Sequence, residues 1–178
     1  MRNQPLLKTK AKSAIINLLK LNSEVKIMQR ITSFSVDHDY IVPGIYVSRI
    51  DDDITTYDMR TRKPNCGDYM DNLTMHSVEH MLATFLRNSD IKNDIIYFGP
   101  MGCQTGFYLL VRNADNKKVL ETVIDVLKKT EAAPEMFGAH RKECGNYRNL
   151  SIESAREECK KFREILESSE QTFIYPTE

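Results

Sequence analysis

The stretch from residue 72 to residue 87 has the hydrophobic spacing of an α-helix. Its apolar residues recur at intervals of three and four positions and are Val78, Met81, Leu82 and Phe85. Residues with this spacing share one face of a helix. Asp71 or Asn72 can cap the first turn. We therefore predict a helix that packs its apolar face into the core.

Other stretches alternate apolar and polar residues, or form short apolar runs rich in β-branched and aromatic side chains, which is typical of strands. The predicted strands are residues 31–36, 45–49, 54–60, 95–98 and 105–112. Residues 51–53 are all aspartate and form the turn between the second and third strands. The Pro, Asn and Gly of residues 63–67 indicate a loop before the helix.

Two more helices are predicted after the last strand. Asp115 or Asn116 caps the first of them, and Pro134 ends it. Ser151 caps the second. The inward-facing residues of the second are Ala155, Cys159, Phe162 and Ile165. Strands and helices follow no regular βαβ order, so we predict an α+β fold in a single domain, with a mostly antiparallel sheet packed against helices.

The charge balance gives no indication of a polyanionic partner. The 178-residue chain carries 25 Lys plus Arg and 25 Asp plus Glu residues, so its formal net charge is zero. Nucleic acid and anionic membranes are therefore not expected as partners, and no apolar run approaches the roughly 20 residues of a membrane span. The four cysteines are widely spaced, and we expect them to be reduced thiols in the cytoplasm.

Residues 1–27 differ from the rest of the chain because six basic side chains stand against a single acid, Glu24. A targeting peptide is one interpretation, but lysines interrupt the apolar run and a small-residue cleavage site is lacking. The interpretation that we favour is an upstream extension without a chemical role, with Met28 as the working start. We therefore predict an N-terminal extension at residues 1–27 and a catalytic domain at residues 28–178.

The predicted helix at residues 72–87 also carries the strongest chemical signal. His76 and His80 are four residues apart, so their imidazoles lie on one face of the helix. This geometry suits two nitrogen ligands on one metal ion. Glu79 lies at the edge of the same face. Residues 76–80 therefore have the order H-x-x-E-H, the inverse of the common zinc-protease motif H-E-x-x-H. A metal site with Glu79 close to it is therefore expected.

A catalytic metal site needs a third protein ligand and an open position. Cys144 lies before a glycine, and Cys103 follows one in a tight loop. Either thiol could be the ligand and the other a reactive group, and spacing alone does not decide between them. Cys66 and Cys159 are expected to be buried small hydrophobic residues.

Five separate motifs resemble the S-ribosylhomocysteine lyases, the LuxS family. They are SFSVDH at 33–38, DMR at 58–60, TMHSVEHMLA at 74–83, GPMGCQTGFY at 99–108 and ECGNY at 143–147. The resemblance runs from about Met28 to the last helix, with the same order and spacing, and implies the fold of that metalloenzyme family. It does not include residues 1–27.

The resemblance implies a division of roles among the candidate residues. His76, His80 and Cys144 would hold one divalent metal per subunit, with water or substrate in the fourth position. The family is associated with iron(II), and zinc or cobalt can replace it. Glu79 and Cys103 would be the two general acid/base groups.

The resemblance also implies a reaction and an assembly. Ser33, His38 and Arg60 match residues that line the substrate pocket of the family. The expected reaction is the non-redox cleavage of S-ribosylhomocysteine to homocysteine and 4,5-dihydroxy-2,3-pentanedione, the precursor of autoinducer-2 in quorum sensing and a product of the methyl cycle. A cytoplasmic homodimer with two active sites at the subunit interface is expected.

Two segments depart from common members of the family. Residues 61–65 read TRKPN where many members have FCQPN, and residues 97–99 read YFG where an Asp-containing segment is often found. Both departures bear on contacts with the substrate. The expected metal and acid/base positions are unchanged.

Two other functions fit part of the pattern. An inverzincin-type metallopeptidase would use the same histidine pair with a downstream carboxylate as the third ligand, and Glu153, Glu157 and Glu158 are the candidates. That function leaves both loop cysteines without a role. A non-catalytic metal-binding module would use both cysteines in a closed Cys2His2 site, which leaves Glu79 without one.

Overall fold

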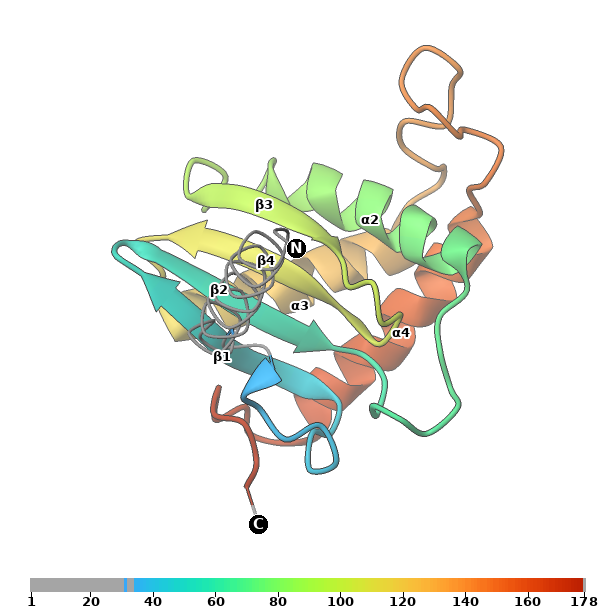
Figure 1. The fold of residues 1–178 in the computed structure, drawn as a ribbon. Coiled ribbons are helices and arrows are strands. Elements are labelled where there is room, and N and C mark those ends of the chain that lie inside the picture. Colours follow the sequence, from blue (N-terminus) through green and yellow to red (C-terminus); the bar gives the residue numbers. More distant parts are fainter. Residues whose placement is uncertain (1–30, 32–33, 178) are drawn as a thin grey trace, which may run out of the picture. The chain divides into compact units, whose positions relative to one another are not determined.

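The computed structural model describes residue 31 and residues 34–177. The chain divides into two compact units, residues 1–35 and 36–178. Among its described residues, the second unit contains a four-stranded antiparallel sheet and three helices (Figure 1). In chain order the elements are β1 (Gly44–Asp51), β2 (Ile54–Arg60), α2 (Asn72–Leu86), β3 (Ile95–Pro100), β4 (Gly106–Arg112), α3 (Asn116–Ala132) and α4 (Ile152–Ser168). The predicted α+β class is confirmed.

The sheet has the strand order β1-β2-β4-β3, with each neighbouring pair antiparallel. β1 and β2 are joined by the aspartate turn, where Asp52 has a φ of 50°. The strands predicted at residues 45–49, 54–60, 95–98 and 105–112 are therefore confirmed. β1 and β3 form the two edges of the sheet, so β2 and β4 carry its central residues.

The strand predicted at residues 31–36 is wrong for its described residues. The Phe34 amide and the Ser35 hydroxyl both donate to the Ile31 carbonyl, at 3.0 and 3.2 Å. These local hydrogen bonds close a tight turn, and they compete with the ladder of a strand. Residues 32 and 33 lie outside the described residues.

The helices cover one face of the sheet and enclose the core (Figure 1). The largest fully buried side chains of that core include Tyr57, Met59, Phe107 and Leu109 from the sheet, Val78, Met81 and Leu82 from α2, and Leu127 from α3. Phe85 is half-buried at the rim of the core. Burial of these side chains is the main force that holds α2 against the sheet.

Each helix begins at a side-chain cap. Asp71 accepts a hydrogen bond from the Thr74 amide at 2.6 Å. Asp115 caps α3 and Ser151 caps α4 in the same way. A cap of this kind stabilises a helix by about 1 kcal/mol. The predicted starts of the helices are therefore confirmed.

None of the helices in the described part of the chain combines the length and the apolar character that a bilayer span requires.

The sheet face away from the helices carries polar side chains. Tyr46, Asp58 and Tyr108 are cross-strand partners on β1, β2 and β4, so they form one row across this face. The neighbouring residues Tyr57 and Met59 point into the core instead, as the alternation of side chains along a strand requires. This polar face lies next to the loop after β3, which carries Cys103.

Candidate active site

α2 presents two histidines toward the loop that follows α3. The ring centroids of His76 and His80 are 4.7 Å apart, with the rings perpendicular. The Nδ1 atoms of His76 and His80 lie 2.8 Å from the Asn149 carbonyl and 3.0 Å from the Phe137 carbonyl. A carbonyl only accepts, so each Nδ1 carries the proton. Both Nε2 lone pairs are therefore left for a metal ion.

Cys144 completes this group. Its Sγ lies 3.3 Å from His76 Nε2, and the ligand atoms of the three residues all lie within 4.8 Å of one another. The Asn146 amide donates to the same sulfur at 3.3 Å. The amide of Cys144 donates to the His140 carbonyl at 3.1 Å, which closes the turn that presents the thiol. The structure thus places Cys144, and not Cys103, beside the histidine pair.

Gly138 allows the loop backbone to approach His80. Its φ is +65°, in the left-handed region that side chains rarely adopt. A Cβ at this position would lie 2.8 Å from His80 Nδ1. The neighbouring Phe137 carbonyl is the one that orients the ring. The sequence analysis assigned no role to Gly138 or Phe137. A glycine in the loop that carries Cys144 is nevertheless a sign that the backbone comes close to another group there.

The donor set fits a divalent transition metal. Two neutral imidazoles and one thiolate are the ligands that iron(II) and zinc accept. Three protein ligands also leave a coordination position for substrate or water. All three side chains are half-buried, so the group borders solvent and is reachable by a small molecule.

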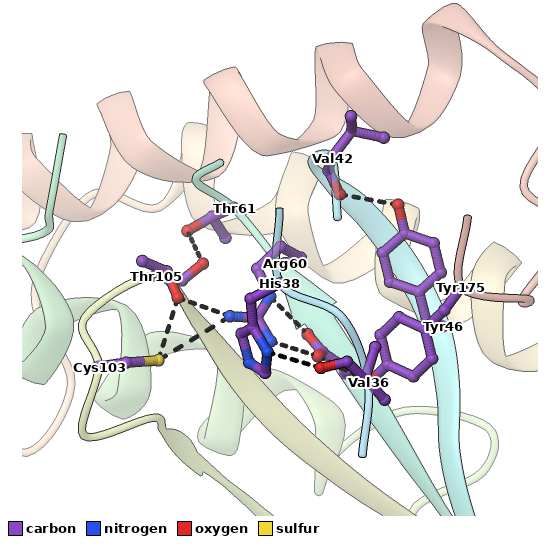
Figure 2. A network of polar contacts seen from close by, with 10 residues as sticks. Val36, His38, Val42, Tyr46, Arg60, Thr61, Cys103, Thr105 and Tyr175 are labelled. Carbon is purple, nitrogen blue, oxygen red and sulfur yellow. Dashed lines mark hydrogen bonds and ion pairs between the residues drawn. The ribbon is translucent and has the colours of Figure 1, made fainter. Parts of the chain in front are cut away.

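Cys103 lies in a different polar network (Figure 2). Its sulfur is 3.0 Å from the Thr105 hydroxyl and 3.9 Å from Arg60 Nη1. Arg60 Nη1 also donates to the Thr105 hydroxyl at 2.6 Å. The thiol is solvent-exposed, whereas Arg60 is 2 % exposed. A buried cation therefore stands beside an accessible thiol.

Arg60 is held by a buried carboxylate. Its Nε donates to Asp58 Oδ1 at 3.1 Å and its Nη2 donates to Asp58 Oδ2 at 2.5 Å. Burial lowers the pKa of Arg60, but the charge and the hydrogen bonds of Asp58, with smaller contributions from Cys103 and Tyr175, together raise it by more, so the guanidinium stays charged. Burial and then Asp58 also raise the pKa of the flanking Tyr46 and Tyr108 phenols.

The remaining residues singled out from the sequence lie at separate places in the structure. Glu79 is half-buried on α2 between the two histidines in sequence. His38 precedes β1, and its Nδ1 lies 3.0 Å from the Val36 carbonyl (Figure 2). Ser33 lies outside the described residues. Cys159 is a buried core residue as predicted, and burial raises the pKa of its thiol. Cys66 is exposed, so its predicted place in the core is wrong.

The carboxylates considered as alternative ligands have other partners. Glu158 is 3 % exposed and accepts two hydrogen bonds from Arg62, both at 2.6 Å. Glu157 pairs with Lys161, and Glu153 accepts from Ser151. In the described part of the chain, the group that could hold a metal is formed by His76, His80 and Cys144. The peptidase alternative therefore finds no support in the structure.

The two departures from the family pattern have structural explanations. Arg62, in the first departing segment, forms the bidentate pair with Glu158 that ties this segment to α4. In the second segment Tyr97 is 49 % exposed, and a Cβ at Gly99 would collide with its hydroxyl. Glycine at position 99 therefore leaves room for the phenol of Tyr97.

Comparisons with known proteins show which family this chain resembles. The sequence model described as S-ribosylhomocysteinase (LuxS) matches residues 31–172. A relative from Borrelia garinii subsp. bavariensis, named S-ribosylhomocysteine lyase, is 39 % identical over 160 residues, which are 84 % of this chain and 100 % of the relative. Relatives of the same name from Clostridium beijerinckii and Desulfotalea psychrophila are 38 % and 39 % identical, again over 84 % of this chain and over 99 % and 100 % of their own. The match spans both α2 and the loop with Cys144. This chain belongs to the LuxS family.

Proposed function

We propose that this chain cleaves S-ribosylhomocysteine to homocysteine and 4,5-dihydroxy-2,3-pentanedione with the help of a divalent metal. The observation that carries the proposal is the convergence of His76, His80 and Cys144 within 4.8 Å in a member of the LuxS family. The relatives named as lyases of this substrate match the chain over nearly their whole length. The pentanedione product would then be the precursor of the signalling molecule autoinducer-2.

His76, His80 and Cys144 would hold the metal through two Nε2 atoms and one Sγ atom. When bound, it supplies Lewis acidity to the oxygen atoms of the sugar. Iron(II) is the proposed metal, with zinc or cobalt able to replace it, because the nitrogen and sulfur donors suit all three. The carbonyls of Asn149 and Phe137 fix both imidazoles in the ligating tautomer.

The reaction requires repeated proton transfer. The carbonyl of the ribose begins at C1, whereas homocysteine leaves from C5. The carbonyl therefore moves to C2 and then to C3, each time by loss of a proton from the next carbon and gain of one at the former carbonyl carbon. Loss of the C4 proton then expels the thiolate from C5, and the enol that forms takes up a proton at C5 and loses its hydroxyl proton to give the dione, so no oxidant or reductant is consumed. We assign these transfers to Glu79 and Cys103.

The surroundings of Cys103 support its role. Arg60 Nη1 lies 3.9 Å from the sulfur, so a thiolate formed during the reaction faces a buried cation. The Thr105 hydroxyl, at 3.0 Å, can donate to the same sulfur. Glu79 is half-buried on α2 and adjacent in sequence to His80, and we propose that its carboxylate serves the same site.

Ser33, His38 and Arg60 are proposed to line the pocket for the sugar. Arg60 directs two of its nitrogens at Asp58, so Nη1 is the nitrogen that lies toward Cys103. This orientation favours a role in which Arg60 contacts the substrate beside Cys103. The proposed catalytic domain is residues 28–178, with residues 1–27 as an extension.

A homodimer is also part of the proposal. Besides its polar row, the sheet face away from the helices carries large side chains that are not fully buried: Tyr97 is exposed, and Tyr108 and Leu110 are half-buried. A surface that mixes aromatic, aliphatic and polar side chains in this way fits an isologous interface between two copies. We propose that the two active sites lie at that interface. A reducing cytoplasm is the proposed location, which the four free cysteines support.

The test is release of homocysteine thiol from synthetic S-ribosylhomocysteine by the purified protein. Activity should fall when a chelator removes the metal and return with iron(II), zinc or cobalt. Hydrolysis of a casein-derived peptide mixture is the control and should stay at background. Peptide hydrolysis without thiol release, or thiol release that is indifferent to metal removal, would contradict the proposal.

A further inference from the structure

The C-terminal residues 171–175 lie along the outer edge of β1. Phe173 forms a parallel bridge with Tyr46, and its carbonyl accepts a hydrogen bond from the Val47 amide at 2.8 Å. The Gln171 side chain accepts from the Ile45 amide at 3.3 Å. The segment is thus held to the sheet by backbone and side-chain contacts on both sides of the bridge.

Phe173 has a φ of +62°, in the left-handed region that bulky residues rarely adopt. Such a conformation persists only where the surroundings determine it. The Phe173 ring packs edge-to-face on Tyr57, with centroids 6.2 Å apart, on the side of the sheet that faces the helices. Two residues later, Tyr175 lies on the opposite face of the sheet, with Tyr46 and Asp58.

Tyr175 contacts the polar network through both its ring and its hydroxyl (Figure 2). The ring stacks on Tyr46 with centroids 4.8 Å apart and planes 19° apart. The hydroxyl donates to Asp58 Oδ2 at 2.8 Å. Burial and the Asp58 charge raise the pKa of Tyr175, so the phenol stays protonated and remains a donor at neutral pH.

A continuous path of contacts joins this phenol to the thiol of Cys103. Asp58 is 1 % exposed and receives hydrogen bonds from Tyr175 and from two nitrogens of Arg60. The third nitrogen, Arg60 Nη1, reaches the Thr105 hydroxyl and the Cys103 sulfur. A buried carboxylate needs all of its donors, so the geometry of Arg60 depends on the donor that Tyr175 supplies.

We propose that Tyr175 is a positioning residue for Cys103, acting through Asp58 and Arg60. Its hydroxyl donates a hydrogen bond to Asp58 and so partly neutralises the carboxylate that also binds Arg60. The positive charge of Arg60 then stabilises a thiolate at Cys103 more strongly. Tyr175 lies outside residues 31–172, the part of the chain that the family's sequence model matches. The consequence for catalysis rests on the proposed role of Cys103, whereas the effect on its reactivity does not.

The experiment compares Tyr175→Phe with the wild type in the metal-loaded protein. The variant keeps the ring that stacks on Tyr46 and removes only the hydroxyl. Alkylation of Cys103 by iodoacetamide is followed at neutral pH by mass spectrometry of the peptide that contains it. We expect alkylation to slow about fivefold, the scale of one hydrogen bond. In thiol release, kcat should fall by a similar factor with KM nearly unchanged, at normal metal content.

Tyr57→Phe is the matched control, because its hydroxyl donates to Asn116 at 2.6 Å on the other face of the sheet. It should lower the melting temperature and leave the alkylation rate and kcat unchanged. Equal alkylation rates in Tyr175→Phe and wild type would overturn the proposal. Tyr175 would then be only an anchor, and Tyr175→Leu would lose stability alone. Absence of thiol release by the wild type would instead count against the proposed function, and the alkylation ratio would still decide the role of Tyr175.

Discussion

Replacing Gly138 by alanine should weaken metal binding without touching a ligand. The new Cβ would lie 2.8 Å from His80 Nδ1 and 3.1 Å from its Cε1. Real Cβ atoms do not approach other heavy atoms this closely, so either the His80 ring or the loop must move. Either movement disturbs the hydrogen bond from His80 Nδ1 to the Phe137 carbonyl, now 3.0 Å long. Loss of such an orienting contact typically costs 10–100-fold in metal affinity.

The same substitution has a second, separable cost. Gly138 has a φ of +65°, and a non-glycine residue in this region costs about 1–2 kcal/mol. That strain acts on the metal-free protein. A 10–100-fold loss of affinity removes a further ~1.4–2.7 kcal/mol of stabilisation at a fixed, saturating metal concentration. The metal-loaded variant should therefore lose more stability than the metal-free variant.

The assay is titration of the metal-free protein with zinc against a fluorescent chelator, beside urea unfolding with and without metal. Gly145→Ala is the matched control, because it changes the same loop, next to Cys144, and its Cβ would meet nothing within 4 Å. Gly145→Ala should bind metal as the wild type does. Wild-type affinity in Gly138→Ala, or an equal loss of affinity in both variants, would refute the reasoning.

Three other predictions test the assignment of roles and the assembly. Cys144→Ala should lose most of its metal, whereas Cys103→Ala and Glu79→Gln should keep near-stoichiometric metal and lose at least about 10²-fold in turnover. The measurement is metal content per chain beside the rate of thiol release. Loss of metal in Cys103→Ala alone would reverse the assignment. Arg60 lies 3.9 Å from Cys103 of its own chain, so verified mixed dimers of Cys103→Ala and Arg60→Ala chains should stay inactive, and recovery of activity would show that Arg60 instead serves the site of the other subunit. A chain that begins at Met28 should fold, dimerise and turn over normally, as judged by sedimentation and thiol release, and a large loss of dimer or activity would contradict the role proposed for residues 1–27.

Local patterns predicted the helices and most strands correctly. Helix caps act within three residues, as Asp71 does on the Thr74 amide, so a short window of sequence contains the whole interaction. The strand predicted at residues 31–36 failed because its β-branched and aromatic composition was outweighed by turn hydrogen bonds to Ile31. Cys66 was placed in the core by the general behaviour of cysteine, but it lies in an exposed loop. Residue type alone does not determine burial.

The candidate site was predictable in part. The spacing of His76 and His80 determines that both imidazoles share a face, because four residues are about one helical turn. The resemblance to a family pointed to Cys144 as the third ligand. Spacing alone left Cys103 as an equal candidate, because the distance from each cysteine-bearing loop to α2 depends on the tertiary packing of the chain. The roles of Gly138 and Tyr175 were not foreseen, since both depend on contacts with distant residues.

The sequence by itself determined the elements, the histidine pair on one helical face and membership of the LuxS family, because these follow from local spacing and from the order of motifs. Tertiary structure alone decided which cysteine lies beside the histidines and which lies beside a buried arginine. His76 and Cys144 are 68 residues apart in the chain, and Asp58 and Tyr175 are 117 apart. Contacts over such separations form only when burial of the core packs α2 and the sheet together, so no local pattern specifies them.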